Sequence, residues 1–152
     1  MKGPFNRNLV VTQLLYGTLA ILSTGKMKVL VVDDDERIRE LLRDMLSGHE
    51  VVEAESGAKA IESFRRERPD LVLMDIVMRG MDGIEATRRI LSENPNAAVL
   101  AVTGFSASQG EAIIEAGARE VIAKPLKRSD LLSTIRKYSG GRMSQGPSRH
   151  PA

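Results

Sequence analysis

The sequence contains no cysteine and no tryptophan, and both absences narrow what the protein can be. Without cysteine there is neither a disulfide scaffold nor a thiolate metal site, although this leaves the compartment open. Aromatic residues make up only 3% of the chain and hydrophobic residues 42%, so we expect an aliphatic core. A length of 152 residues fits one domain with extensions at its ends.

Acidic residues are missing from both ends of the chain. Residues 1–26 and 142–152 hold five basic side chains, which are Lys2, Arg7, Lys26, Arg142 and Arg149. The whole chain has 22 basic and 20 acidic residues, so residues 27–141 keep 17 basic and all 20 acidic ones, a net charge of −3. This body lacks the basic surface that is typical of nucleic-acid-binding proteins, and we expect no nucleic acid among its partners.

The segment LVVTQLLYGTLAILSTG, residues 9–25, is uncharged and mostly apolar. Polar and small residues interrupt it, and it is barely long enough to span a bilayer, so we expect no membrane insertion. MKVLVVDDD, which begins at Met27, looks like a separate start. We therefore interpret residues 1–26 as an extension outside the core fold. A packed helix and an export signal are the alternatives, the latter because basic residues precede the segment.

Between residues 27 and 139, two hydrophobic periodicities alternate, which predicts five strands that are each followed by a helix. Runs of β-branched and aliphatic residues predict strands at 28–33, 51–54, 70–75, 97–103 and 119–123. Apolar residues at helical spacing predict helices at 35–48, 56–67, 83–94, 106–117 and 129–138. Because the strands are apolar rather than alternating, they favour an α/β fold with a parallel sheet covered on both faces. The tail, residues 140–152, has no periodicity and is predicted to be disordered.

Residues at the predicted helix ends support these boundaries. Asp35 and Ser56 are expected as N-caps, and Ser108 with Glu111 forms a capping-box pattern. Gly48 is placed to end the first helix, as expected for a residue that tolerates positive φ.

Chemically capable side chains follow four of the five predicted strands. Asp33 and Asp34 end the first strand, Asp75 the third, Thr103 the fourth and Lys124 the fifth. Ligands bind outside the carboxyl ends of parallel strands, so we expect these side chains at one edge of the sheet. Carboxylates ~4 Å apart repel each other by on the order of 4 kcal/mol per pair at an effective dielectric of ~20. They must therefore be protonated or neutralised.

A hard divalent cation such as Mg²⁺ neutralises carboxylate oxygens well, and Lys124 adds a further positive charge. The hydroxyl of Thr103 is able to bind an oxygen of an anion. Together these groups indicate a phosphoryl-transfer site in which Asp75 attacks phosphorus and forms an acyl phosphate. Each residue alone has an ordinary explanation as a helix cap, a turn residue, a strand residue or a solvated lysine. Their joint placement at the strand ends favours the functional interpretation.

The segments VLVVDDD, LVLMDIVMRGMDG, AVTG and AKPL, in this order and at suitable spacing, resemble the receiver domain of bacterial response regulators in two-component signalling. The resemblance extends over about residues 27–139, which we expect to form a single receiver domain similar to the chemotaxis regulators. It implies a flavodoxin-like, doubly wound, five-stranded parallel sheet in the order 2-1-3-4-5.

The resemblance also implies a role for each acid. Asp75 matches the phosphorylated aspartate. Asp34 matches a direct Mg²⁺ ligand, and Asp33 matches its partner, which often acts through water. The main-chain carbonyl of Val77 matches a further ligand of the Mg²⁺ cofactor. Val77 and Phe105 also match the positions that flank the approach of water, and because neither orients water we expect a slowly decaying acyl phosphate.

Two further matches concern the predicted phosphoryl group. Thr103 matches the hydroxyl that moves toward it, and Lys124 matches the lysine that pairs with it. The bond between Lys124 and Pro125 matches one that is cis in the family. Two positions depart from the family pattern. Arg79 replaces a common proline, and its guanidinium would favour an anion or simply be solvated. Val121 replaces an aromatic switch residue and has no ring to move, so we do not expect the usual readout through that side chain.

The resemblance implies that a phosphohistidine on a histidine kinase or phosphotransfer protein donates the phosphoryl group. It implies a cytoplasmic protein that catalyses only its own phosphorylation and dephosphorylation. The face formed by residues 106–117, 119–123 and 129–138 is expected to change shape and bind a downstream target protein. No output domain follows the last predicted helix, so we expect the chain to act by docking or by relaying phosphate.

Two other functions are compatible with parts of this pattern. A Mg²⁺-dependent phosphatase with an aspartyl-phosphate intermediate uses similar groups, but such enzymes generally carry a DxDxT motif, which the first strand lacks. A receiver-like module that is never phosphorylated would have the same fold. The complete set of acids, hydroxyl and lysine makes the phospho-accepting receiver the main hypothesis.

Overall fold

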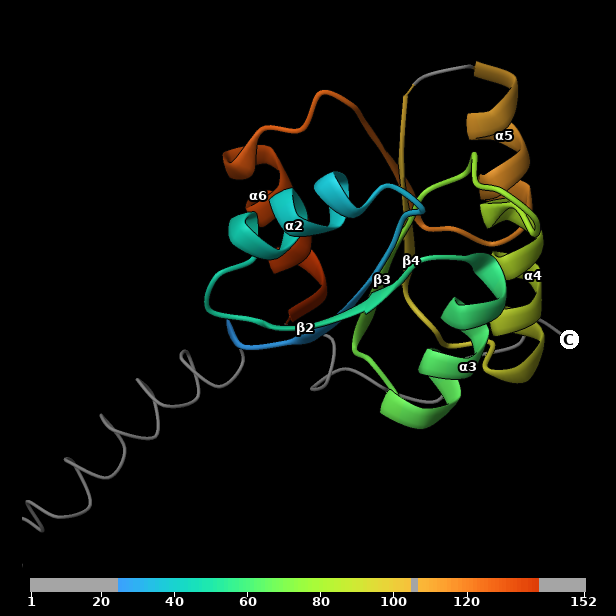
Figure 1. Ribbon diagram of the computed structural model, residues 1–152, viewed down its shortest axis with the longest axis horizontal. Helices are drawn as coiled ribbons and strands as arrows, with labels where there is room; N and C mark the ends of the chain where they lie inside the picture. The colour runs from blue at the N-terminus through green and yellow to red at the C-terminus, as the bar shows by residue number, and fades with distance from the viewer. Residues whose placement is uncertain (1–24, 105–106, 140–152) are drawn as a thin grey trace, which may run out of the picture.

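The computed structural model describes residues 25–104 and 107–139, which fold as a parallel sheet between two layers of helices (Figure 1). The strands are β1 (Lys28–Val32), β2 (Glu50–Ala54), β3 (Leu71–Met74), β4 (Val99–Thr103) and β5 (Glu120–Ala123). The helices are α2 (Glu36–Met45), α3 (Gly57–Glu67), α4 (Gly83–Glu93), α5 (Ala107–Glu115) and α6 (Arg128–Ser139). Strands and helices alternate along the described chain, as the two periodicities predicted.

The sheet order is β2-β1-β3-β4-β5, and every neighbouring pair is parallel. This confirms both the fold class and the strand order that the family resemblance implied. The interior strand β1 lies between β2 and β3, with Val31 opposite Glu53 on one side and Leu73 on the other. The order reverses direction between β1 and β3, and the crevice at such a point is where this class of sheet binds ligands.

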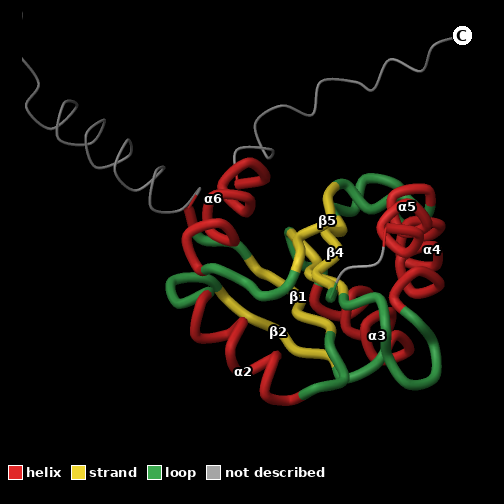
Figure 2. Tube along the Cα trace, turned by 90° about the horizontal axis from the view of Figure 1, so that it is seen from above, coloured by secondary structure: helices red, strands yellow, loops and turns green. Residues whose placement is uncertain are grey.

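Alternate residues of each buried strand contribute to two separate cores. One core lies between the sheet and α3, α4 and α5, and it includes Leu30, Phe64 and Ile90. The other lies between the sheet and α2 and α6, and it includes Val31 and Leu131. Figure 2 shows the sheet between these two groups of helices. Burial on both faces explains why the strands are apolar throughout instead of alternating.

The predicted helix starts at Asp35 and Ser56 are confirmed. The side chain of Asp35 accepts a hydrogen bond from the amide of Arg37, and that of Ser56 accepts one from Lys59. The capping box at Ser108 is wrong, because the described part of α5 already begins at Ala107 and Ser108 lies within the helix.

The predicted extension at residues 1–26 lies outside the described residues except for its last two positions, and the tail at 140–152 lies outside them entirely. Among the helices that the structure does describe, none combines the length and apolar character needed to cross a bilayer.

Candidate functional site

Asp33 follows β1 and Asp75 follows β3, and these two acids lie side by side. The amide of Asp33 donates to the carbonyl of Ala54 at 3.2 Å, and the amide of Asp75 donates to the carbonyl of Val32 at 2.9 Å. Each acid therefore continues the sheet by one hydrogen bond beyond its strand. Parallel strands lie about 5 Å apart, so this backbone pairing fixes the two carboxylates as neighbours.

Three carboxylates meet at this edge of the sheet. One oxygen from each of Asp33, Asp34 and Asp75 lies within 4.8 Å of the other two. Asp33 and Asp75 are buried, whereas Asp34 is exposed to solvent. An all-oxygen donor set with an open side suits a hard divalent cation that keeps some of its water, such as Mg²⁺. The predicted donor from the main chain of Val77 stays a prediction, and the Val77 residue is 59% exposed.

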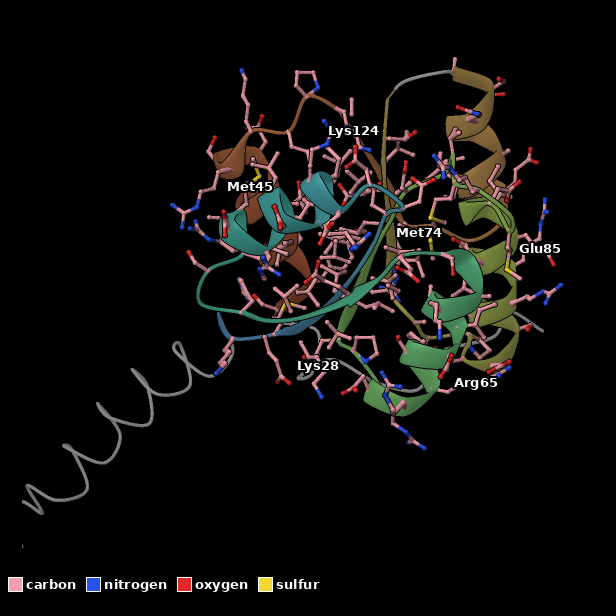
Figure 3. The ribbon with its side chains drawn as sticks, in the orientation of Figure 1. Lys28, Met45, Arg65, Met74, Glu85 and Lys124 are labelled. Atoms are coloured by element: carbon pink, nitrogen blue, oxygen red, sulfur yellow. The ribbon has the colours of Figure 1, made fainter. Side chains whose placement is uncertain are left out.

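Lys124 brings an ammonium group to the same cluster. Its Nζ lies 3.1 Å from Oδ2 of Asp33 and 3.7 Å from Oδ1 of Asp75, and its side chain is 24% exposed. In Figure 3 it lies above the end of the strand that contains Met74. The bond between Lys124 and Pro125 is cis, as the resemblance implied.

The carboxyl group of Asp75 has an altered affinity for protons. Its burial raises its pKa to about 6, and the neighbouring Asp33 carboxylate acts in the same direction. Lys124 and a hydrogen bond from the amide of Ile76 oppose this shift only in part. Burial and the neighbouring negative charge both disfavour the ionised form of the Asp75 carboxyl. The cluster therefore holds too little positive charge to balance its acids.

Thr103 lies at the end of β4 with its side chain buried, and its hydroxyl donates to the carbonyl of Gly104 at 3.3 Å. The amide of Lys124 donates to the carbonyl of Thr103 at 2.9 Å, so the hydroxyl and the ammonium stand on paired strands. Val121 is half-buried in β5 and packs against the core on the α3, α4 and α5 side. The roles in switching that were predicted for Thr103, Lys124 and Val121 stay predictions.

Two further predictions concern Arg79 and Phe105. The amide of Arg79 donates to Oδ2 of Asp34 at 3.1 Å, so this loop holds the exposed acid through its main chain. The Arg79 residue is exposed, and the predicted effect of its guanidinium stays a prediction. Phe105, which was predicted to exclude water, lies outside the described residues.

Sequence reasoning missed two residues that support the site. A Cβ atom on Gly83 would lie 1.9 Å from the main-chain oxygen of Asp75, and its amide donates to the carbonyl of Ile76 at 2.8 Å. The guanidinium of Arg39 donates to the main-chain carbonyl of Asp33 at 2.8 Å. The available signal for Arg39 was a cation near a helix N-terminus, where the helix dipole disfavours it.

Comparison with known proteins agrees with this geometry. The profile of the response regulator receiver domain matches residues 29–136. The chemotaxis protein CheY of Thermotoga maritima is 38% identical over 117 residues, which cover 74% of this chain and 97% of that protein. The response regulator MprA of Mycobacterium leprae is 38% identical over 113 residues, which cover 72% of this chain but only 50% of that protein.

Solved structures show the same fold. A CheY-like receiver domain protein from Methanospirillum hungatei superposes with a TM-score of 0.73 at 29% identity, covering 78% of this chain and 98% of that one. A chain of the CheX–CheY–BeF₃–Mg²⁺ complex from Borrelia burgdorferi has a TM-score of 0.69 at 27% identity, covering 72% of this chain and 87% of that one. The match over most of the chain, together with the fold, shows that the protein belongs to the response regulator receiver domain family.

Proposed function

We propose that Asp75 is the phospho-acceptor of this receiver, with Mg²⁺ held by Asp33, Asp34, Asp75 and the main-chain carbonyl of Val77. The observation that carries the proposal is the charge balance of the cluster. Three carboxylates meet one ammonium group, from Lys124, which leaves an excess of two negative charges. A divalent cation cancels that excess and, when bound, neutralises the oxygens of an incoming phosphoryl group.

The reaction is a transfer between two protein side chains. An oxygen of Asp75 attacks the phosphorus of a phosphohistidine, the phosphorus–nitrogen bond breaks, and the imidazole leaves with the electron pair and takes up a proton. Because the pKa of Asp75 is raised only to about 6, its carboxylate is mostly ionised at neutral pH and able to attack. The donor is a histidine kinase or a phosphotransfer protein, and the protein acts in the cytoplasm.

The new phosphoryl group adds about −1.5 to −2 charges at the edge of the sheet. Lys124 pairs with it and Thr103 turns its hydroxyl toward it. Thr103 ends β4 and Lys124 directly follows β5, and the hydrogen bond between their main chains makes these strand ends move together. The face formed by α5, β5 and α6 then changes shape and binds a downstream protein. Val121 cannot provide an aromatic readout, so the backbone and neighbouring aliphatic side chains carry this change.

The experiment is incubation with acetyl phosphate and Mg²⁺ followed by mass spectrometry of the intact protein. We expect the parent chain to gain the mass of one phosphoryl group and the Asp75→Ala variant to gain none. Asp130→Asn, an exposed acid in α6, is the matched control and should be labelled like the parent. Labelling of Asp75→Ala at the parent level would show that another residue accepts the phosphoryl group.

A further inference from the structure

Arg39 of α2 reaches back to the first acid of the site. Its Nη1 donates to the main-chain carbonyl of Asp33 at 2.8 Å, and its Nε lies 3.4 Å from Oε1 of Glu53 in β2. Only 13% of the Arg39 side chain is exposed. A guanidinium presents several donors in a rigid fork, so one side chain can hold two groups in a fixed relation to each other.

This contact completes the immobilisation of Asp33. Its amide donates to Ala54, one of its carboxylate oxygens accepts from the amide of Asp35 at 2.9 Å, and the other accepts from Lys124 at 3.1 Å. Arg39 holds the remaining polar group of the residue, the main-chain carbonyl. That carbonyl belongs to the peptide unit that joins Asp33 to Asp34, so its orientation sets the direction in which both carboxylates leave the backbone.

The effect of Arg39 is geometric more than electrostatic. Its positive charge is paired with Glu53, which is also paired with Arg43 at 2.8 Å. Replacing either arginine by methionine removes one positive charge paired with this carboxylate, so the contact with the Asp33 carbonyl is what distinguishes Arg39 from Arg43. A buried carbonyl that loses its donor is costly, and the peptide unit is then expected to rotate toward water or another donor.

We propose that Arg39 is a positioning residue of the acidic site, which acts through the main chain of Asp33 and is itself oriented by Glu53. The inference rests on the proposed function, because it assigns Arg39 to the Mg²⁺ affinity of that site. Groups that orient metal ligands typically contribute a factor of about 10–100 in affinity. Arg39 therefore sets how well the protein binds Mg²⁺ before any phosphoryl group arrives.

The test is the dissociation constant for Mg²⁺, measured by isothermal titration calorimetry on the full chain. We compare the parent with Arg39→Met, Arg39→Lys and Arg43→Met, each shown to be folded by circular dichroism at the titration temperature. Arg43→Met is the matched control, because Arg43 lies one helical turn along α2 and binds the same Glu53. The second measurement is the melting temperature of each variant in EDTA.

We expect Arg39→Met to weaken Mg²⁺ binding about 10-fold and Arg43→Met to leave it unchanged. Arg39→Lys should lie between Arg39→Met and the parent, since one ammonium group does not span both partners. A purely structural role would lower the melting temperature in EDTA and leave the dissociation constant as in the parent. Should Arg39→Met fail to fold, parent-like affinity in Arg39→Lys overturns the inference. A parent chain that binds Mg²⁺ and an Arg39→Met variant that binds it equally well overturn the inference alone, whereas a parent that binds no Mg²⁺ overturns the proposed function as well.

Discussion

The surroundings of Asp75 disfavour the negative charge of its carboxylate. It is buried beside Asp33, and the nearest ammonium group, on Lys124, lies 3.7 Å away and is shared with Asp33. The raised pKa is the consequence, and it is a property of the folded protein without metal. The clustered carboxylates repel one another and destabilise the fold. Their negative charges also attract a divalent cation.

Asp75→Asn is expected to stabilise the metal-free protein at pH 7.5 by about 2 kcal/mol. The folded-state pKa of Asp75, about 6, lies above the usual value of 3.8, so the folded protein holds its proton longer than the unfolded chain. The stability linked to that proton is present below about pH 4 and is lost as the pH rises through 6. Urea denaturation in EDTA at pH 7.5 and pH 4.5 should show a difference between variant and parent that shrinks in acid. An equal difference at both values would contradict this assignment.

Gly83→Ala tests how closely the backbone packs behind the phospho-acceptor. The added methyl group would lie 1.9 Å from the main-chain oxygen of Asp75, so the backbone has to shift. We expect a loss of about 1–3 kcal/mol in unfolding free energy, measured in urea, and slower labelling by acetyl phosphate. Gly110→Ala in α5 is the control, because its methyl group meets no atom within 4 Å and should stabilise the helix by about 0.5–1 kcal/mol.

Val77 is predicted to control the lifetime of the acyl phosphate. The residue is 59% exposed in the loop that follows β3, where an apolar side chain excludes water without orienting it. We expect Val77→Asn to shorten the lifetime several-fold, because an amide binds and orients a water molecule near phosphorus. The measurement is the loss of the phosphoryl mass with time in Mg²⁺ after the donor is removed. Decay of the parent as fast as the variant would rule out this role.

Among the elements, α3 has an unusual end. Its C-cap residue, Arg68, has a φ of 46° in the left-handed region, a conformation that glycine adopts without steric cost. We expect Arg68→Gly to raise the unfolding free energy by about 0.5–1 kcal/mol. Thermal and urea denaturation measure the change. Gly48→Ala, at a φ of 99° after α2, is the reciprocal control and should lower stability.

At the scale of the whole molecule, the acids of the site follow strands whose side chains belong to both cores. A ligand that binds only the folded state at 100 times its dissociation constant stabilises it by about 2.7 kcal/mol. We therefore expect saturating Mg²⁺ to raise the melting temperature by roughly 10 °C over EDTA. Asp34→Asn should reduce this increase, whereas Asp130→Asn should not. A melting temperature that ignores Mg²⁺ in the parent would argue against the metal site.

The order of strands and helices, the apolar strands and the caps at Asp35 and Ser56 were predictable from the sequence, because they depend on local periodicity and neighbouring residues. The acids and Lys124 were predictable for the same reason, since each follows a strand and parallel strands share one edge. The capping box at Ser108 shows the limit of this reasoning, because a local motif does not decide where a helix begins.

Tertiary structure alone decided which groups support the site. Arg39 and Gly83 stand six and eight residues from the acids whose main chains they contact, and local sequence patterns do not show those contacts. They arise because α2 and the first residue of α4 pack against the main chain at the ends of β1 and β3. The raised pKa of Asp75 likewise depends on burial and on Asp33, 42 positions earlier in the chain. Sequence placed the charged groups on one edge, and packing determined their distances and their exposure to water.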